Sequence, residues 1–283
     1  MNTKKAVTFV STLAVCLAGT LPLVAEEHKV PKVLQIIAEQ VKPGRGAAHT
    51  KSESAWVAAL RKAGDTSYYL AMTGGGEALY MTPWDSYEAI EKAEKTYDAN
   101  TALVAEIDRI SAQDGELLSG TRAMMAELVP DISYHAEWDT AKMRYFEVTT
   151  VRLNPGYGRD FTQLRKQVNE AHDKAKVDER WAIYEVVTGA PAGTYLIIQP
   201  HVSLADWDKS EEQHGKDYQD ALGDDTRART RDFQRSAVKS SQTELYEFSP
   251  KMSYLSKAFT DRDPDYWTPK PAPAAAKEEK KKP

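Results

Sequence analysis

Two glutamates, Glu147 and Glu185, each stand in a run of the sequence that is otherwise rich in apolar and β-branched residues. An isolated carboxylate is costly to bury, and burial raises its pKa so that it can bind a ligand or take a proton from one. Both are therefore candidate catalytic acid–base residues or polar anchors. The alternative is that they lie in water at an open sheet edge, or pair with Arg144 or Arg152.

Further side chains near the same runs could line a ligand pocket with these glutamates. Aromatic residues supply apolar walls and a few polar groups orient a small molecule, although aromatic residues at such positions also form ordinary core. The candidate pocket residues are Gln35, Glu39, Tyr68, Tyr145, Thr149, Trp181, His135 and His201.

A metal or haem site would need at least one of the six histidines. His135 and His201 follow expected strands, whereas His49, His172 and His214 stand in polar helical stretches and are expected in solvent. Neither His135 nor His201 has a partner at the spacing His-x-x-x-His or Glu-x-x-His on an expected helix. The sequence thus predicts no metal site and no cofactor.

The N-terminal segment 1–25 is typical of a secretory signal: Lys4 and Lys5 precede a short apolar run that ends before Ala25. Export is predicted, to the periplasm or the medium, and the run is too short to span a membrane. Cys16 is the only cysteine and lies inside this segment, which leaves lipidation open and gives the mature chain no disulfide.

The charge balance and the composition of the C-terminal end limit the partners that the chain is expected to bind. The chain has 37 basic and 42 acidic residues and a formal net charge of −5, which argues against nucleic acid. Residues 259–283 are expected to be a disordered tail rich in Pro, Ala and Lys, because such a composition buries little apolar surface.

Short motifs recur in the same order in the two halves of the chain. Val41-Lys42-Pro43-Gly44-Arg45-Gly46 returns as Leu153-Asn154-Pro155-Gly156-Tyr157-Gly158, Thr73-Gly74 as Thr188-Gly189, and Pro130-Asp131-Ile132-Ser133-Tyr134 as Pro250-Lys251-Met252-Ser253-Tyr254. We interpret residues 26–140 and 141–258 as two copies of one unit.

Each copy has the pattern β-α-β-β-α-β. In the first, strands are expected at 33–41, 67–72, 78–82 and 127–135, with helices at 47–62 and from Asp85 to about Met125. In the second, strands are expected at 144–153, 181–187, 194–199 and 244–255, with helices at 159–176 and from Ser203 to about Val238. This is the ferredoxin-like arrangement, and the fold class is α+β.

The repeated pattern resembles the dimeric α+β barrel superfamily, in which two such sheets pack into a barrel with helices outside. Members include cofactor-free monooxygenases of the antibiotic-biosynthesis type, NIPSNAP-like and EthD-like proteins, and the haem-binding chlorite dismutase group. The resemblance covers roughly residues 30–256 and implies that one polypeptide forms the barrel that smaller relatives form by dimerising. No histidine matches the haem ligand of the chlorite dismutase group, which puts haem in doubt.

The two faces of the expected first strands differ in polarity. One face is apolar or small in both copies and is expected under the helices: Leu34, Ile36, Ala38, Phe146, Val148 and Thr150. The other is mixed and is expected to face the space between the sheets: Gln35, Ile37, Glu39, Glu147, Thr149 and Val151.

The sequence supports two functions and leaves open whether the chain is an enzyme. The first is an exported barrel that binds an apolar or aromatic small molecule between the sheets, as a cofactor-independent monooxygenase would. The second is a non-catalytic exported scaffold; a haem-binding barrel is a further alternative. Whether chains associate further is open.

Overall fold

The computed structural model describes residues 30–268. The first half comprises β1 (Val33–Val41), α1 (Gly46–Ala63), β2 (Leu70–Gly74), β3 (Glu77–Trp84), α2 (Tyr87–Ala99), α3 (Thr101–Gly115) and β4 (Leu118–Leu128). The second comprises β5 (Tyr145–Leu153), α4 (Gly158–Ala175), β6 (Ala182–Thr188), β7 (Thr194–His201), α5 (Leu204–Glu212), α6 (Lys216–Ser236) and β8 (Val238–Phe248). The predicted ferredoxin-like order is confirmed, with the second helical region of each half divided into two helices.

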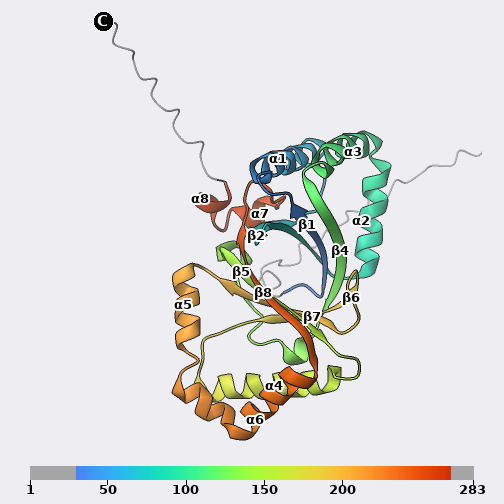
Figure 1. Ribbon diagram of the computed structural model, residues 1–283. Coiled ribbons are helices and arrows are strands. Elements are labelled where there is room, and N and C mark those ends of the chain that lie inside the picture. The colour runs from blue at the N-terminus through green and yellow to red at the C-terminus, as the bar shows by residue number, and fades with distance from the viewer. Residues whose placement is uncertain (1–29, 269–283) are drawn as a thin grey trace, which may run out of the picture.

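The strands close into one antiparallel barrel in the order β1-β3-β2-β8-β5-β7-β6-β4. Helices α1–α3 lie outside the first half and α4–α6 outside the second, at opposite ends of the molecule (Figure 1). Within residues 30–268, two pairs of strands join the halves, β2–β8 and β4–β6. We call these pairs the seams.

Reciprocal segments reinforce the seams. After β4, the 3-10 turn η1 (Pro130–Ile132) leads to Ser133, whose Oγ accepts a hydrogen bond from the Ile183 amide at 2.9 Å. After β8, Ser253 Oγ accepts one from the Ala71 amide, also at 2.9 Å. The Pro-x-x-Ser-Tyr motif thus crosses in each case to the second strand of the other half.

Glycine is required where the seam backbones approach each other. A Cβ on Gly74 would lie 2.2 Å from the Leu245 carbonyl oxygen, and one on Gly189 would lie 1.9 Å from that of Ala123. Gly189 also has a φ of 82°, which disfavours residues with side chains. The Thr-Gly pairs noted in the sequence therefore mark the seams.

Several helices begin close to their predicted first residues, at turns or caps that the sequence supplies. Gly44 and Gly156 have φ values of 77° and 92°, which only glycine adopts readily, in the turns before α1 and α4. Ser203, where a helix was expected to begin, caps α5: its Oγ accepts a hydrogen bond from the Asp206 amide. The cap of α2 is Ser86, one residue after the predicted start.

The last strand of each half begins earlier than predicted. β4 begins at Leu118 and β8 at Val238, where the sequence indicated helix, and the strands end at Leu128 and Phe248. The first parts of both strands are exposed and polar, so they lack the apolar alternation that identifies a half-buried strand.

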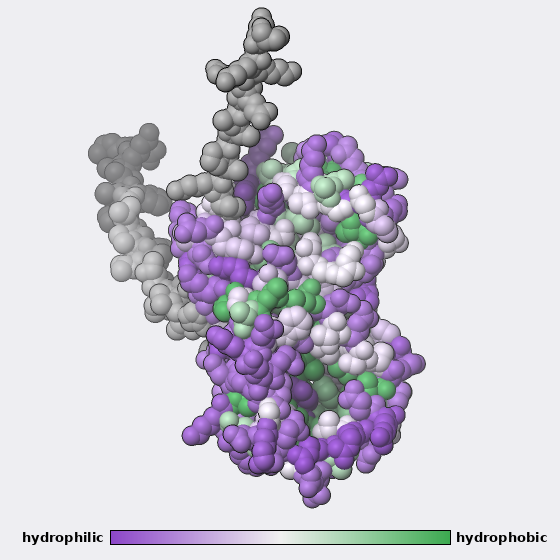
Figure 2. All heavy atoms as spheres, turned by 60° about the vertical axis from the view of Figure 1, so that its left-hand side comes forward, coloured by the Kyte–Doolittle hydropathy of each residue, from purple (hydrophilic) through white to green (hydrophobic). Residues whose placement is uncertain are grey.

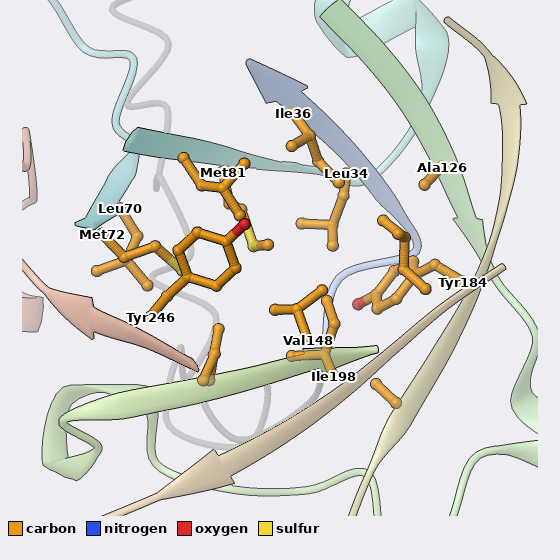
Figure 3. Close-up of a cluster of buried hydrophobic side chains, with 14 of the residues drawn as sticks. Leu34, Ile36, Leu70, Met72, Met81, Ala126, Val148, Tyr184, Ile198 and Tyr246 are labelled. Atoms are coloured by element: carbon orange, nitrogen blue, oxygen red, sulfur yellow. The ribbon is translucent and has the colours of Figure 1, made fainter. Parts of the chain in front are cut away.

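The predicted orientation of the strand faces is wrong. Leu34, Ile36, Phe146 and Val148 belong to one buried cluster with side chains from all eight strands, which is possible only inside the barrel. Figure 3 shows several of them pointing toward one another. The mixed face, with Gln35, Glu39, Glu147 and Thr149, therefore lies outside, against the helices, where partner side chains make buried carboxylates tolerable.

The chain continues past β8 and packs against the barrel. Helices α7 (Lys257–Thr260) and α8 (Pro264–Trp267) follow, and Trp267 is 5% exposed, with Nε1 donating to the Ala141 carbonyl oxygen at 2.8 Å. Ala141 lies in the 3-10 turn η2 (Thr140–Lys142). A tail beginning at residue 259 is therefore wrong for 259–268; residues 269–283, like the predicted signal 1–25, lie outside the described residues.

The surface around α5 and α8 is mostly hydrophilic, with apolar side chains in small groups near the middle and in a hollow of the lower half (Figure 2). Within residues 30–268, no helix is both long enough and apolar enough to cross a membrane.

Candidate functional site

A cavity of about 510 Å³, here called the mouth pocket, opens at one end of the barrel interior. Its floor consists of interior side chains from six strands, Leu34, Leu70, Met81, Phe146, Tyr184 and Ile198. The C-terminal segment contributes Leu255, Ala258 and Phe259 to the wall. The pocket is therefore apolar, and both halves of the chain form it.

A few polar groups lie around this apolar floor. Tyr68, a predicted pocket residue, lines the pocket and is 45% exposed. The Tyr184 hydroxyl donates to the Pro31 carbonyl oxygen at 2.9 Å, so its hydrogen is already used. Arg262 pairs with Asp139 at the same mouth. This arrangement suits a ligand that is mainly apolar.

A second cavity of about 630 Å³, the α2 groove, lies outside the barrel between the sheet and helix α2. Two predicted pocket residues, Gln35 and Tyr68, line it. The Gln35 side chain accepts a hydrogen bond from Trp84 Nε1 at 3.2 Å. Tyr69 also lines the groove, and its buried hydroxyl has no hydrogen-bond partner among the described residues.

Behind Tyr69 lies a buried group of titratable side chains, the Glu53 cluster: Glu39, His49, Glu53, Tyr80 and Asp114. The Tyr69 and Tyr80 rings meet edge to face at 5.8 Å. His49 bonds Asp114 through Nδ1 at 3.0 Å and meets the Tyr80 hydroxyl through Nε2 at 3.2 Å. The Oε2 atom of Glu39 lies 3.6 Å from the Nε2 atom of His49. Helix α1 brings His49 and Glu53 to the same face because they are four residues apart.

Burial is the largest influence on the pKa values of Glu53 and His49 in this cluster. Burial and the nearby charges of Glu39 and Asp114 raise the pKa of Glu53 to about 8, so that it holds its proton at neutral pH. Burial would lower the pKa of His49, but its hydrogen bond to Asp114 and the surrounding carboxylates raise it. The cluster can hold and release a proton near neutral pH.

The second half contains a different buried group, the His172 cluster: His172, Glu179, Ser210 and His214. Glu179 Oε2 lies 3.0 Å from His172 Nε2 and 3.2 Å from His214 Nε2, and Ser210 Oγ donates to the other oxygen of Glu179. Burial would raise the pKa of Glu179, but the hydrogen bonds from His172, His214 and Ser210 lower it to about 2.

A polar cavity of about 280 Å³, the Glu179 pocket, adjoins this cluster. Glu179, His201, Asp206 and Ser210 are among the residues that line it. His201, a predicted pocket residue, is 4% exposed, and its Nε2 lies 3.6 Å from Glu147 Oε2 without a hydrogen-bond partner among the described residues. The structure thus brings the predicted Glu147 and His201 together.

The second predicted glutamate lies elsewhere. Glu185 is exposed and pairs across the ladder with Tyr195, whereas Glu147 pairs with Gln199 on the same strand β7. Four residues along a strand separate these positions by roughly 13 Å. Glu147 and Glu185 therefore do not form one site.

Most of the remaining predicted pocket residues are dispersed. Trp181 is buried in core and donates through Nε1 to the Ile132 carbonyl oxygen at 3.1 Å. Thr149 bonds Thr243 at 2.8 Å. His135 is exposed and stacks on Tyr134. Tyr145 is half-buried and lies opposite His201 in the β5–β7 ladder, and Glu39 belongs to the Glu53 cluster.

The prediction that the helical histidines lie in solvent is wrong for two of them, because His49 and His172 are each 2% exposed. The spacing of His49 and Glu53 on one helix face could have indicated the first cluster. No local spacing indicates the second, because α4, the α4–β6 connection, α5 and the α5–α6 connection each supply one residue.

No family model and no curated protein matches the sequence. Among solved structures, the chain is similar to an anthrone oxidase-like protein at a TM-score of 0.50 and 14% identity, over 82% of this chain and 96% of that one. It is also similar to a candidate monooxygenase from Lactobacillus acidophilus (TM-score 0.46, 8% identity, 76% and 93% covered) and to a candidate chlorite dismutase (0.46, 11%, 79% and 97%).

At these identities the likeness concerns the fold alone. It agrees with the strand order, the closure of the barrel and the position of the helices outside it. The chain therefore has the dimeric α+β barrel fold, with both halves of the barrel in one polypeptide.

Proposed function

We propose that this chain is an exported barrel protein that binds an apolar or aromatic small molecule in the mouth pocket. The observation that carries the proposal is the apolar cavity of about 510 Å³ enclosed by six strands and the C-terminal segment. Ligand pockets in proteins have volumes of roughly 300–1,000 Å³ and apolar walls with few polar groups. Export rests on residues 1–25 of the sequence.

Binding is tested with the neutral aromatic dye N-phenyl-1-naphthylamine, whose fluorescence rises in apolar surroundings. Ala258 lies on the exposed face of α7 and lines the pocket, so Ala258→Trp would fill the cavity with little effect on folding. We expect the wild-type chain to bind one equivalent of dye and Ala258→Trp to weaken binding at least tenfold.

The matched control is Ala105→Trp, which places the same side chain on the exposed surface of α3, away from the pocket. This variant should bind the dye as the wild type does. Equal binding by Ala258→Trp, or no binding by the wild type, would contradict the proposal and favour a non-catalytic scaffold.

A second candidate function, acid–base chemistry of the kind that begins a cofactor-independent monooxygenase reaction, is favoured by the Glu53 cluster. Glu53 exchanges its proton near pH 8, and Tyr69 both lines the α2 groove and contacts the Tyr80 ring of the cluster. A ligand in the groove could exchange a proton with Glu53 through Tyr69.

Oxygen uptake with anthrone as the probe substrate tests this second function. We expect uptake by the wild type and at least a tenfold loss of its rate in Glu53→Gln and in Tyr69→Phe. Glu88→Gln, which changes an exposed carboxylate on α2, should keep the wild-type rate. No uptake above the protein-free rate, or equal rates in all variants, would rule out this function for anthrones.

A further inference from the structure

The His172 cluster brings two imidazoles and one carboxylate to a single point. His172 lies in α4, Glu179 precedes β6, and His214 lies between α5 and α6. Their ligand atoms all lie within 4.8 Å of one another. The side chains of His172 and Glu179 are 3% and 4% exposed, so this is a buried assembly of donor atoms rather than a surface group of charges.

The hydrogen-bond pattern around His172 leaves a position for a cation. Its Nδ1 lies 2.8 Å from the Val168 carbonyl oxygen, which can only accept, so Nδ1 carries a hydrogen. The Nε2 lone pair of the neutral ring then faces Glu179 Oε2, an acceptor, at 3.0 Å. This contact is favourable only if Nε2 gains a second proton or a cation lies between the two atoms.

The distances fit a metal ion. Nitrogen and oxygen ligands lie about 2.0–2.2 Å from a bound zinc ion, which places neighbouring ligand atoms about 2.8–3.6 Å apart for angles of about 90–110° at the metal. The two nitrogen–oxygen distances, 3.0 and 3.2 Å, are in this range. Two histidines and one carboxylate also form the ligand set that suits divalent ions of intermediate softness.

The surroundings hold the ligands in place. The Val168 carbonyl fixes the tautomer of His172, and Ser210 binds the Glu179 oxygen that faces away from the histidines; such outer partners orient metal ligands. The Tyr218 ring packs against both imidazoles, with centroids at 4.6 and 5.1 Å.

The cluster also has an entry path. His214 is 33% exposed, and Glu179 and Ser210 line the Glu179 pocket. The buried His201 side chain lines the same pocket, and its Nε2 has no hydrogen-bond partner among the described residues. A ligand set of three side chains beside an open pocket leaves a coordination position for water or a substrate.

The Glu53 cluster lacks these properties. It has one imidazole, and both of its nitrogens already have hydrogen-bond partners: Asp114 at Nδ1 and the Tyr80 hydroxyl, which can donate, at Nε2. No imidazole lone pair of that cluster is therefore free to bind a metal ion.

We propose that His172, Glu179 and His214 bind one divalent transition-metal ion of the class of Zn²⁺ and Fe²⁺, with a free coordination position toward the Glu179 pocket. The site lies outside the barrel, in the second half of the chain. It is separate from the mouth pocket, so its test is independent of dye binding.

The experiment uses full-length, tag-free protein that has been treated with a chelator and then titrated with Co²⁺, which reports its ligands through visible absorption. We expect one equivalent to bind, Zn²⁺ to displace it and Mg²⁺ to leave it bound. His214→Ala and Glu179→Gln should each weaken Co²⁺ binding more than about 100-fold, beyond the effect of losing an outer partner.

The matched control is His135→Asn, which removes an exposed histidine of the same chain; asparagine tolerates the positive φ at that position. It should bind Co²⁺ as the wild type does. Failure of the wild type to bind, unchanged binding by both ligand variants, or displacement by Mg²⁺ would overturn the proposal.

If the ligand variants fail to fold, as circular dichroism would show, the NMR spectrum of the Co²⁺-loaded wild type decides. Two paramagnetically shifted imidazole N–H signals are expected, one from each histidine. The absence of shifted imidazole signals would overturn the proposal.

Discussion

Glu53 shows how a carboxylic acid can be part of a folded core. It is 6% exposed, and burial together with the charges of Glu39 and Asp114 raises its pKa to about 8. The protonated side chain avoids the cost of burying another charge beside two carboxylates. Above pH 8 the cluster would hold an additional negative charge, which His49 offsets only in part.

This protonation makes the stability of the chain depend on pH. The pKa of Glu53 is raised from 4.5 when it is exposed to about 8 in the folded chain, so its contribution is complete below pH 4.5 and is lost as the pH rises to 8. The raised pKa of His49 acts in the same direction. We expect the free energy of unfolding in urea to fall by on the order of 1 kcal/mol per pH unit through this range.

Glu53→Gln should flatten this dependence, because glutamine resembles the protonated acid and cannot ionise. The variant is expected to match the wild type at pH 6 within about 1 kcal/mol and to be more stable at pH 9 by about 1–2 kcal/mol. Urea titrations at both pH values measure the difference. Parallel pH profiles for the two proteins would show that Glu53 is ionised in the folded chain.

For single residues, the sequence predicted which side chains belong to a site better than it predicted the face of the sheet to which they point. Glu147 and His201 were both candidates and lie 3.6 Å apart. However, the prediction that polar strand residues face the lumen was wrong, because α1 supplies His49 as a partner for Glu39 on the outer face, and Asp114 of α3 in turn binds His49. Such partners come from distant parts of the chain, and a single strand contains no information about them.

The C-terminal helices α7 and α8 pack against the barrel, which the sequence did not predict. α7 and α8 are each four residues long, too short to show a helical period, and they lie next to a stretch of tail-like composition. Their anchor is Trp267, which contacts Tyr266, Phe259 and Phe248. By contrast, the predicted bounds of β1 agree with the structure, because this run is rich in β-forming residues and ends just before the Pro43-Gly44 turn.

Removing this anchor should affect both folding and binding. Trp267→Ala is expected to destabilise the chain by about 3–5 kcal/mol, as large-to-small changes in a core do, and to weaken dye binding because α7 forms part of the mouth pocket wall. Thermal unfolding and dye titration measure the two effects.

Trp267→Phe is the matched variant, because it keeps a ring but loses the hydrogen bond to Ala141. A loss of about 1–2 kcal/mol is expected, with dye binding retained. If Trp267→Ala were as stable as the wild type, the C-terminal helices would not be docked as described.

Across the whole molecule, the halves meet through two equivalent contacts. Gly74 permits the β2 backbone to approach β8, and Gly189 permits β6 to approach β4. Ser253 and Ser133 then bind the strands that precede these glycines. The same short motifs, Thr-Gly and Pro-x-x-Ser-Tyr, make these contacts in both halves, and these contacts close the barrel.

Alanine at either glycine should therefore destabilise the whole barrel. Gly74→Ala and Gly189→Ala would each place a methyl group against a backbone carbonyl, and we expect each to cost more than about 2 kcal/mol in the free energy of unfolding. Gly120→Ala is the control, since nothing lies within 4 Å of its added Cβ; equal stability of all three variants would contradict the close approach.

The seams also indicate an order of folding. Every other strand pair joins strands of one half, so each four-stranded sheet can assemble from contacts within its own half. The seam β2–β8, however, pairs residues that are the farthest apart in the chain, such as Thr73 and Glu247, and contacts of large sequence separation form slowly. Pairing at this seam should therefore be the slow step of refolding, and the mouth pocket should form only after it.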